Sequence, residues 1–146
     1  MADLKLLALD TDDLAVISAH TQDSVFRTDA VSFSARAGQF AIGINRFVWE
    51  DVPAKGKSFE RRRALLAFKR VRAVRSTGID RTKADDVHSL LAIRFVPQGE
   101  GPDGTLELTL SGNAAIALDV ECIEVQLADT GAAWETVSKP RHPGVA

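Results

Sequence analysis

A two-residue alternation of apolar and polar side chains recurs between residues 31 and 120. The clearest example is residues 106–110, which are Leu-Glu-Leu-Thr-Leu. Successive side chains of a β-strand point to opposite faces, so this period is typical of strands that bury one face and expose the other. Turn segments such as Ala37-Gly38 connect neighbouring runs within a few residues, as in β-hairpins. The sequence therefore predicts a mainly antiparallel sheet.

The alternating segments, together with one apolar run near the N-terminus, predict up to seven strands. They cover residues 4–9, 31–34, 40–49, 63–76, 91–96, 106–110 and 116–120. In the third strand the large side chains move from even to odd positions at Phe47, and one inserted residue near Asn45-Arg46 would restore the register as a β-bulge. Residues 63–76 also contain helix formers, but the strands on either side favour a strand. Two polar segments are expected to be loops, residues 50–60 and 77–87.

Two segments have the three- and four-residue spacing of an amphipathic helix. Residues 12–22 follow Thr11, whose hydroxyl can cap a helix, and they begin with two aspartates that suit the positive end of the helix dipole. Residues 120–130 follow Asp119, a second potential cap, and precede Gly131, a typical helix stop. The sequence therefore predicts one helix before most of the strands and one after them.

The expected fold class is α+β: an antiparallel bent sheet or partial barrel of about seven strands with an N-terminal and a C-terminal helix. Pleckstrin-homology-like domains have this order of elements, and a plain sheet with two helices on one face is the alternative. A chain of 146 residues can bury a sizeable core, and we expect a single globular domain over residues 1–134. Residues 135–146 contain two prolines and few apolar groups, which predicts a loose C-terminal tail.

The composition argues against several classes of protein. The chain has one cysteine, Cys122, so it forms no intramolecular disulfide and offers no cysteine pair to a metal. Its three histidines are far apart in the sequence, and we expect no metal and no cofactor. No segment approaches the roughly 18 consecutive apolar residues of a membrane span, and the first residues are not those of a signal peptide. We therefore expect a cytoplasmic protein that does not contact membranes.

The glycines of residues 99–104, Gly-Glu-Gly-Pro-Asp-Gly, have the spacing of a dinucleotide-binding fingerprint. That fingerprint requires a strand before it and a helix after it, whereas the predicted strand of residues 106–110 follows these glycines. Pro102 also lacks the amide that would contact a phosphate. We therefore interpret the segment as a hairpin loop.

A basic segment interrupts an otherwise acidic chain. Residues 55–83 contain 11 of the 18 Lys and Arg side chains but only two of the 20 Asp and Glu side chains. A polyanion such as RNA or DNA could bind through residues 61–75, where Lys69, Arg70, Arg72 and Arg75 are the candidate contacts. Aromatic side chains that would stack on bases are sparse there. A protein-binding surface or intramolecular ion pairing is therefore favoured over nucleic-acid binding.

Arg46 and Trp49 are candidate partner-binding residues at the end of a predicted strand. Both residue types are enriched at binding hot spots, and two acidic residues follow them directly. The favoured alternative is structural, because large aromatic side chains fill cores as readily as interfaces. In that case Trp49 packs in the core and Arg46 pairs with a neighbouring acid.

His20 is the catalytic candidate of the chain. An imidazole titrates near neutral pH, and Asp23, three residues later on the predicted helix, could fix its tautomer. The sequence offers no obvious nucleophile, and Cys122 is expected to be a small buried side chain. We therefore favour a structural histidine at the edge of the core.

Three parts of the chain resemble one known family. They are residues 3–20, which begin Asp-Leu-Lys-Leu, residues 45–50, which are Asn-Arg-Phe-Val-Trp-Glu, and residues 118–124, Leu-Asp-Val-Glu-Cys-Ile-Glu, with Trp134 beyond them. The chain resembles a bacterial family catalogued as domain of unknown function 2948, found mainly in alphaproteobacteria. The resemblance implies a small cytoplasmic bacterial protein with no established activity, and hence no functional residues to carry over.

These observations favour a non-enzymatic protein-interaction or ligand-binding module of the bacterial cytoplasm. A protein partner is favoured over nucleic acid, and association of identical chains stays open. Two alternatives belong to other classes: a polyanion binder that uses residues 61–75, and a small enzyme that uses His20.

Overall fold

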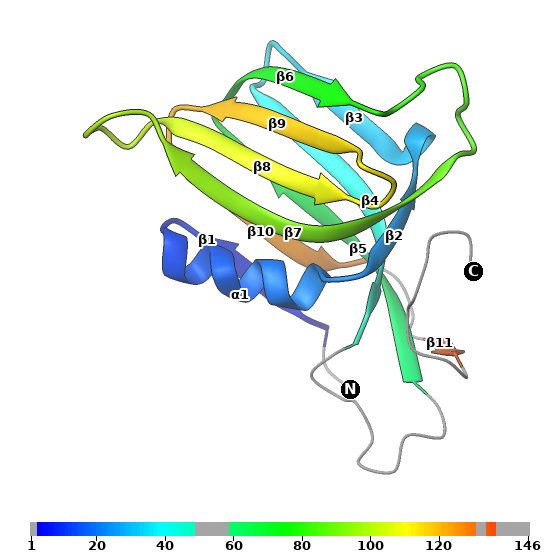
Figure 1. The fold of residues 1–146 in the computed structure, drawn as a ribbon. Helices are drawn as coiled ribbons and strands as arrows, with labels where there is room; N and C mark the ends of the chain where they lie inside the picture. Colours follow the sequence, from blue (N-terminus) through cyan, green and yellow to red (C-terminus); the bar gives the residue numbers. More distant parts are fainter. Residues whose placement is uncertain (1–2, 49–58, 131–133, 137–146) are drawn as a thin grey trace.

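One antiparallel sheet, rolled on itself, forms most of the part of the chain that the structure describes (Figure 1). The structure is a computed structural model that describes residues 3–48, 59–130 and 134–136. Its elements, in chain order, are β1 (Lys5–Ala8), α1 (Thr11–Thr21), β2 (Ser24–Arg27), the short 3-10 helix η1 (Thr28–Ala30), β3 (Val31–Ser34), β4 (Gln39–Phe47), β5 (Phe59–Phe68), β6 (Val71–Thr77), β7 (Val87–Pro97), β8 (Gly104–Leu110), β9 (Ala115–Val120), β10 (Val125–Asp129) and β11 (Trp134–Thr136).

The sheet folds into two facing layers. Its strand order is β1-β10-β5-β4-β2-β7-β8-β9-β6, with β3 added to β4 and β11 added to β5. In Figure 1 the strands β6 to β9 lie in front of β4, β5 and β10, and β2 joins the two layers. The helix α1 contacts both β1 and β7, so it covers one opening between the layers. The strands β3 and β6 border the opposite opening.

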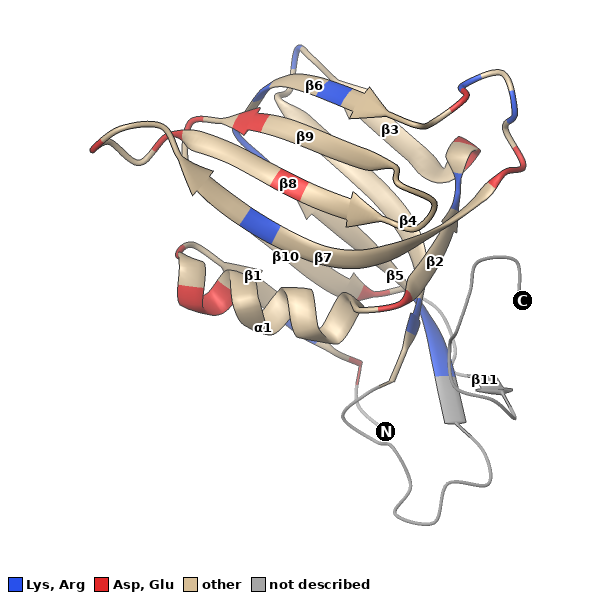
Figure 2. Ribbon diagram, viewed as in Figure 1, with Lys and Arg blue, Asp and Glu red and all other residues tan. Residues whose placement is uncertain are grey.

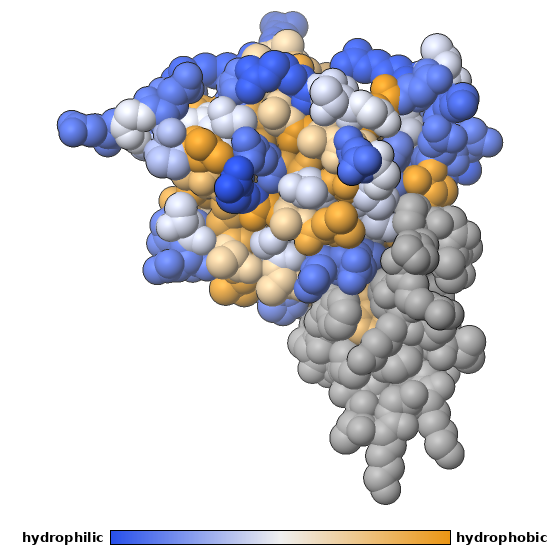
Figure 3. Space-filling view, viewed as in Figure 1, coloured by the Kyte–Doolittle hydropathy of each residue, from blue (hydrophilic) through white to orange (hydrophobic). Residues whose placement is uncertain are grey.

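The hydrophobic core lies between these layers. Leu106, Leu108 and Leu118 contribute from the front layer, and Phe40 and Leu66 from the back layer, each at most 1% exposed. These positions alternate along their strands with less buried residues, which is the pattern that the sequence predicted. On the outer surface, Figure 3 shows hydrophobic and hydrophilic residues interspersed over the face that carries α1 and β7 to β9. Such a mixed surface is ordinary for a face that meets water.

The predicted N-terminal helix is confirmed as α1, with one correction at its start. The capping residue is Asp10 rather than Thr11: Asp10 has an extended backbone, and its Oδ1 accepts a hydrogen bond from the backbone N–H of Asp13 at 2.8 Å. Thr11 is already the first helical residue. Leu14 and Ile17 are buried against the sheet, as expected for an amphipathic helix. Within the described residues, no helix is both long and apolar enough to cross a membrane.

The predicted C-terminal helix over residues 120–130 is wrong. Residues 121–124 are bends and irregular backbone, and residues 125–129 form β10 between β1 and β5. Val125 and Leu127 are fully buried, which is a two-residue period, although Ile123 and Leu127 also have helical spacing. Because β10 is hydrogen-bonded to β1 on one side and to β5 on the other, the segment is a strand and not a helix. The helix on which the pleckstrin-homology-like order depends is therefore not found at residues 120–130.

The sheet has more strands than the seven that the sequence predicted. β2, β10 and β11 were not expected, and the strand predicted over residues 63–76 is two strands, β5 and β6. The chain turns between them at Arg70, whose φ of 59° lies in the left-handed region. The expected hairpin of residues 31–44 is confirmed as β3 and β4. Of the loop and tail predicted for residues 50–60 and 135–146, only residues 59–60 and 135–136 are described, and these lie in β5 and β11.

The β-bulge predicted near Asn45-Arg46 is also wrong. β4 pairs with β5 without a register shift up to Phe47, which lies opposite Arg61. Arg46 therefore keeps the inward direction of Ile44, and both Arg46 and Phe47 are fully buried. The charged side chain of Arg46 occupies an inward position of β4, so the strand needs no inserted residue.

Candidate functional site

The strands β3 and β6 border a gap in the rolled sheet. β3 pairs with β4 and β6 pairs with β9, so each has a second edge without a strand beside it among the described residues. The two edges meet at one end, where the backbone N–H of Val71 donates to the carbonyl of Gly38 at 2.9 Å. Gly38 has a φ of 63°, and a Cβ there would lie 3.2 Å from the Val71 carbonyl oxygen, so this close approach favours glycine.

A cavity of about 540 Å³ occupies this gap, and we name it the β3–β6 cavity. Its walls come from β2, η1, β3 and β4 on one side, and from β6, the loop of residues 78–86, β7 and β9 on the other. The lining residues are Phe26, Thr28, Asp29, Val31, Ser32, Phe33, Phe40, Val74, Ser76, Ile79, Arg81, Ala84, His88 and Ile116. Its volume and its mainly apolar wall with a few polar groups are typical of sites for small molecules.

His88 is the buried polar group of the cavity. Its Nε2 shares a hydrogen bond of 2.8 Å with Thr28 Oγ1, and its ring lies 5.4 Å from the ring of Phe26. Burial lowers the pKa of His88, and the negative charge of Asp86 opposes this shift only in part. The imidazole is therefore neutral at neutral pH, so it presents a hydrogen-bonding group and no charge to the cavity.

We expect His88 to make the protein less stable as the pH falls from about 7.5 to about 5.5. The pKa of His88 in the folded protein lies below its ordinary value of about 6.5, so the unfolded chain binds more protons in this window and the free energy of unfolding decreases. Urea denaturation at both pH values should show a smaller decrease for His88→Gln than for the wild type. His20→Gln is the control, and a His88→Gln variant with wild-type pH dependence would contradict the assignment.

The loop of residues 78–86 is fixed against η1 by backbone hydrogen bonds. The carbonyl of Ala84 accepts from the N–H of Asp29 at 3.0 Å, and the carbonyl of Asp86 accepts from the N–H of Thr28 at 2.9 Å. Because both ends of this contact are backbone groups, the loop has a defined position beside the cavity. The loop forms one wall of the cavity, and Arg81 is among its lining residues.

Two charged side chains line the β3–β6 cavity. Asp29 receives two hydrogen bonds from Arg27, at 3.0 and 2.8 Å, so its charge is balanced locally. Arg81 has no ion pair or hydrogen bond with any residue that the structure describes. The cavity therefore has an apolar interior with one unpaired positive charge at its edge.

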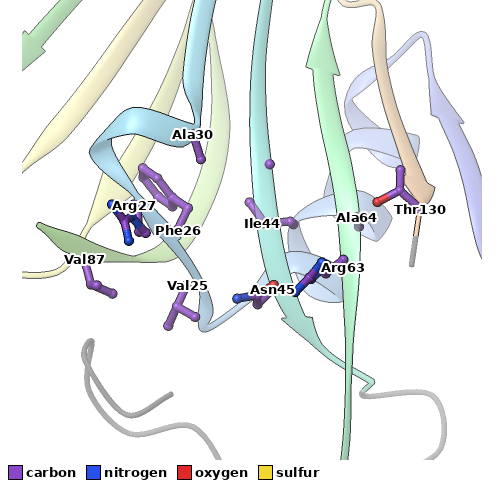
Figure 4. A pocket seen from close by; sticks show the side chains of 11 residues that line it. Val25, Phe26, Arg27, Ala30, Ile44, Asn45, Arg63, Ala64, Val87 and Thr130 are labelled. Carbon is purple, nitrogen blue, oxygen red and sulfur yellow. The ribbon is translucent and has the colours of Figure 1, made fainter. Parts of the chain in front are cut away.

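A second pocket, of about 420 Å³, lies where β2 and β4 separate (Figure 4). These two strands share a single residue pair, Val25 opposite Asn45, so the sheet is open beside them. Figure 4 shows the side chains of Arg27 and Arg63 on opposite sides of this pocket, and Arg27 is already paired with Asp29. Its polar groups do not converge on one point, so we favour the β3–β6 cavity as the candidate site.

The predicted basic contacts lie beside acidic side chains of the same chain. Figure 2 shows basic and acidic positions on the neighbouring strands β6 and β9. Arg75 donates to both carboxylate oxygens of Asp119 at 2.7 and 2.9 Å, and Arg70 lies 3.5 Å from Glu124. Arg72 lies 3.9 Å from Glu121. These exposed arginines are therefore partly neutralised within the chain, whereas no ion pair of Lys69 is described.

Arg46 lies inside the protein, so it has no surface to offer a partner. Its Nε and Nη2 donate to the two carboxylate oxygens of Asp129 at 2.8 and 3.0 Å. Both side chains are at most 1% exposed. Arg62 of β5 lies opposite Arg46 of β4 in the strand register. Arg46 therefore pairs with an acid, but this acid is Asp129, 83 residues away in sequence, rather than the neighbouring acid that was expected. Trp49, the other candidate of that cluster, lies outside the described residues.

His20 and Asp23 do not form the expected pair. The Nδ1 of His20 lies 2.9 Å from the carbonyl oxygen of Val16 in the same helix, so this backbone group fixes the ring. Asp23 follows the helix with a φ of 62°, and Arg61 is the charged group that acts on its carboxyl group. Burial raises the pKa of Asp23, and the charge of Arg61 opposes that shift. The geometry therefore does not support His20 as a base oriented by Asp23.

The sequence did not single out Thr28, Arg81 or His88 as site residues. They lie in η1, in the loop of residues 78–86 and in β7, and none belongs to a local motif. Only the rolling of the sheet brings β2, β3, β6 and β7 around one cavity. No pattern within a single segment could have predicted the site.

Over the described residues, the rolled antiparallel sheet, the α-helix α1 and the open-edged cavity define an α+β fold with a candidate ligand site. A family model described as "Protein of unknown function (DUF2948)" matches residues 4–142, and the chain belongs to this family. The resemblance noted in the sequence is thereby confirmed. No curated protein and no solved structure matches the chain.

Proposed function

We propose that this protein is a non-enzymatic binding module that holds a small molecule in the β3–β6 cavity. The observation that carries the proposal is a cavity of about 540 Å³ that opens between two strand edges and reaches core residues such as Phe40 and Ile116. An opening between edges gives a ligand access to apolar side chains without unfolding the sheet. Of the two kinds of module expected from the sequence, the cavity favours the ligand-binding one.

The other proposed functions have less support. The arginines of residues 61–75 that would contact a polyanion have carboxylates nearby, as Arg75 has Asp119. An enzyme that uses His20 lacks the expected carboxylate beside the imidazole. The single free cysteine, Cys122, suits the reducing cytoplasm, and a cytoplasmic location is part of the proposal.

We expect the uncharged fluorescent probe phenylnaphthylamine to bind the protein saturably, and we expect Ser76→Phe to weaken this binding at least about tenfold. Ser76 lines the cavity from β6, so an added phenyl ring occupies volume that a ligand needs. The probe gains fluorescence when it leaves water, so titration of each variant gives its dissociation constant. A tenfold weakening corresponds to about 1.4 kcal/mol of binding free energy.

Thr77→Phe is the matched control for this experiment. Thr77 is the next residue of β6, it is exposed, and it does not line the cavity. Because successive strand residues point to opposite faces, the same substitution there adds the same apolar group outside the cavity. Equal binding by the two variants, when their urea midpoints match that of the wild type, would overturn the proposal.

A further inference from the structure

We infer that the ligand of the β3–β6 cavity is an amphipathic anion, with an apolar body inside the cavity and one acidic group bound by Arg81. This inference rests on the proposed function, because it names the ligand class of the same site. The acidic group is a carboxylate or a sulfonate-like oxyanion, since such groups match the planar guanidinium fork.

Arg81 places a positive charge at the edge of the cavity. Arg81 lines the cavity, is exposed to solvent and has no ionic partner among the described residues. The other charged lining residue, Asp29, accepts two hydrogen bonds from Arg27. A bound anion would therefore meet one available guanidinium at the edge of the cavity, while the nearest lining carboxylate is already paired.

The acidic residues of the same loop form no ion pair with Arg81 among the described residues. The Oδ1 of Asp80 accepts hydrogen bonds from the backbone N–H and the hydroxyl of Thr82, at 2.9 and 2.6 Å. The charge of Asp85 acts on Arg27, and the charge of Asp86 acts on His88. None of these three carboxylates lines the cavity.

The interior of the cavity suits the apolar part of such a ligand. Phe26, Phe40 and Ile116 are at most 3% exposed and belong to the hydrophobic core. The polar pair of buried His88 and partly buried Thr28 already shares a hydrogen bond. A second charge on the ligand would find no opposite charge at this depth, since burial keeps His88 neutral. A single acidic group at one end is therefore the arrangement that fits.

Two probes that differ in one acidic group test the inference. Anilinonaphthalene sulfonate has the aromatic rings of phenylnaphthylamine and adds a sulfonate. We expect the wild type to bind the sulfonate probe more tightly than the neutral probe. The Arg81→Gln variant should lose about fivefold in this ratio of dissociation constants, which is the size of an exposed ion pair. Lys83→Gln removes a cation from the same loop that does not line the cavity, and it should leave the ratio unchanged.

Each outcome separates the inference from the proposed function. If neither probe binds, or if Ser76→Phe and Thr77→Phe act alike, the cavity is not a ligand site and both proposals fail. If the neutral probe binds in the cavity but the wild type shows no preference for the sulfonate, only the inference fails. A preference that survives Arg81→Gln, or that Lys83→Gln reduces equally, also overturns the role of Arg81. Loss of the preference in Arg81→Gln alone supports it.

Discussion

Replacement of Asp129 by Asn should lower the free energy of unfolding by about 3–5 kcal/mol, because it leaves the charge of Arg46 buried without its counterion. The Asp129 carboxylate accepts two hydrogen bonds from Arg46 and one of 2.8 Å from the backbone N–H of Leu4. Arg62 lies 4.0 Å away and carries a second positive charge, which an amide would not balance. Urea denaturation at neutral pH measures the loss.

Asp119→Asn is the matched control, because Asp119 also accepts two hydrogen bonds from one arginine. The distances from Arg75 are 2.7 and 2.9 Å, similar to those between Arg46 and Asp129. The side chain of Arg75 is 60% exposed, however, so water solvates its charge when the ion pair is lost. We expect this variant to lose less than about 1 kcal/mol. Similar losses in the two variants would mean that burial does not determine the strength of these pairs.

The pH dependence of stability provides a second readout of Asp129. Burial raises the pKa of Asp129, but the hydrogen bonds from Arg46 and Leu4 and the positive charges outweigh burial, and the pKa lies below its ordinary value. The contribution of this carboxylate is therefore complete above about pH 4, the ordinary value of the unfolded chain, and is lost as the pH falls through the folded pKa. We expect the stability curves of the wild type and Asp129→Asn to converge in acid.

The sequence predicted those elements whose signal is contained in one segment. The alternation of residues 106–110 and 116–120 and the hairpin of β3 and β4 specify strands directly, because a two-residue period has no helical equivalent over that length. The helix α1 was predicted for the same reason, from a cap and an apolar face. Its capping residue and both of its bounds were each misplaced by one position.

The Arg46–Asp129 pair and the β3–β6 cavity depend on contacts between distant segments. The large side chains move from even to odd positions at Phe47, so the sequence suggested a bulge near Asn45-Arg46. The structure keeps the register and places Asp129 of β10 beside the guanidinium instead. A single sequence contains the two residues but not the sheet order that joins them. In the same way, Arg81 lines the cavity from a loop whose backbone is hydrogen-bonded to η1, a segment more than 50 residues earlier in the chain.

Replacement of Leu127 by Ala should lower the free energy of unfolding by about 2–5 kcal/mol, and a companion variant tests why the helix prediction failed there. Leu127 is fully buried in β10, where it lies opposite Leu6 of β1 and Leu66 of β5.

A helix would also bury Leu127, but it would turn Val125 away from the face that holds Leu127. In the strand Val125 is fully buried too, so Val125→Ala should cost about 2 kcal/mol. Gln126→Ala, at an exposed position between them, should change stability by less than about 0.5 kcal/mol. Urea denaturation of the three variants decides the matter: a large loss for Leu127→Ala with almost none for Val125→Ala would indicate a helical period and contradict β10.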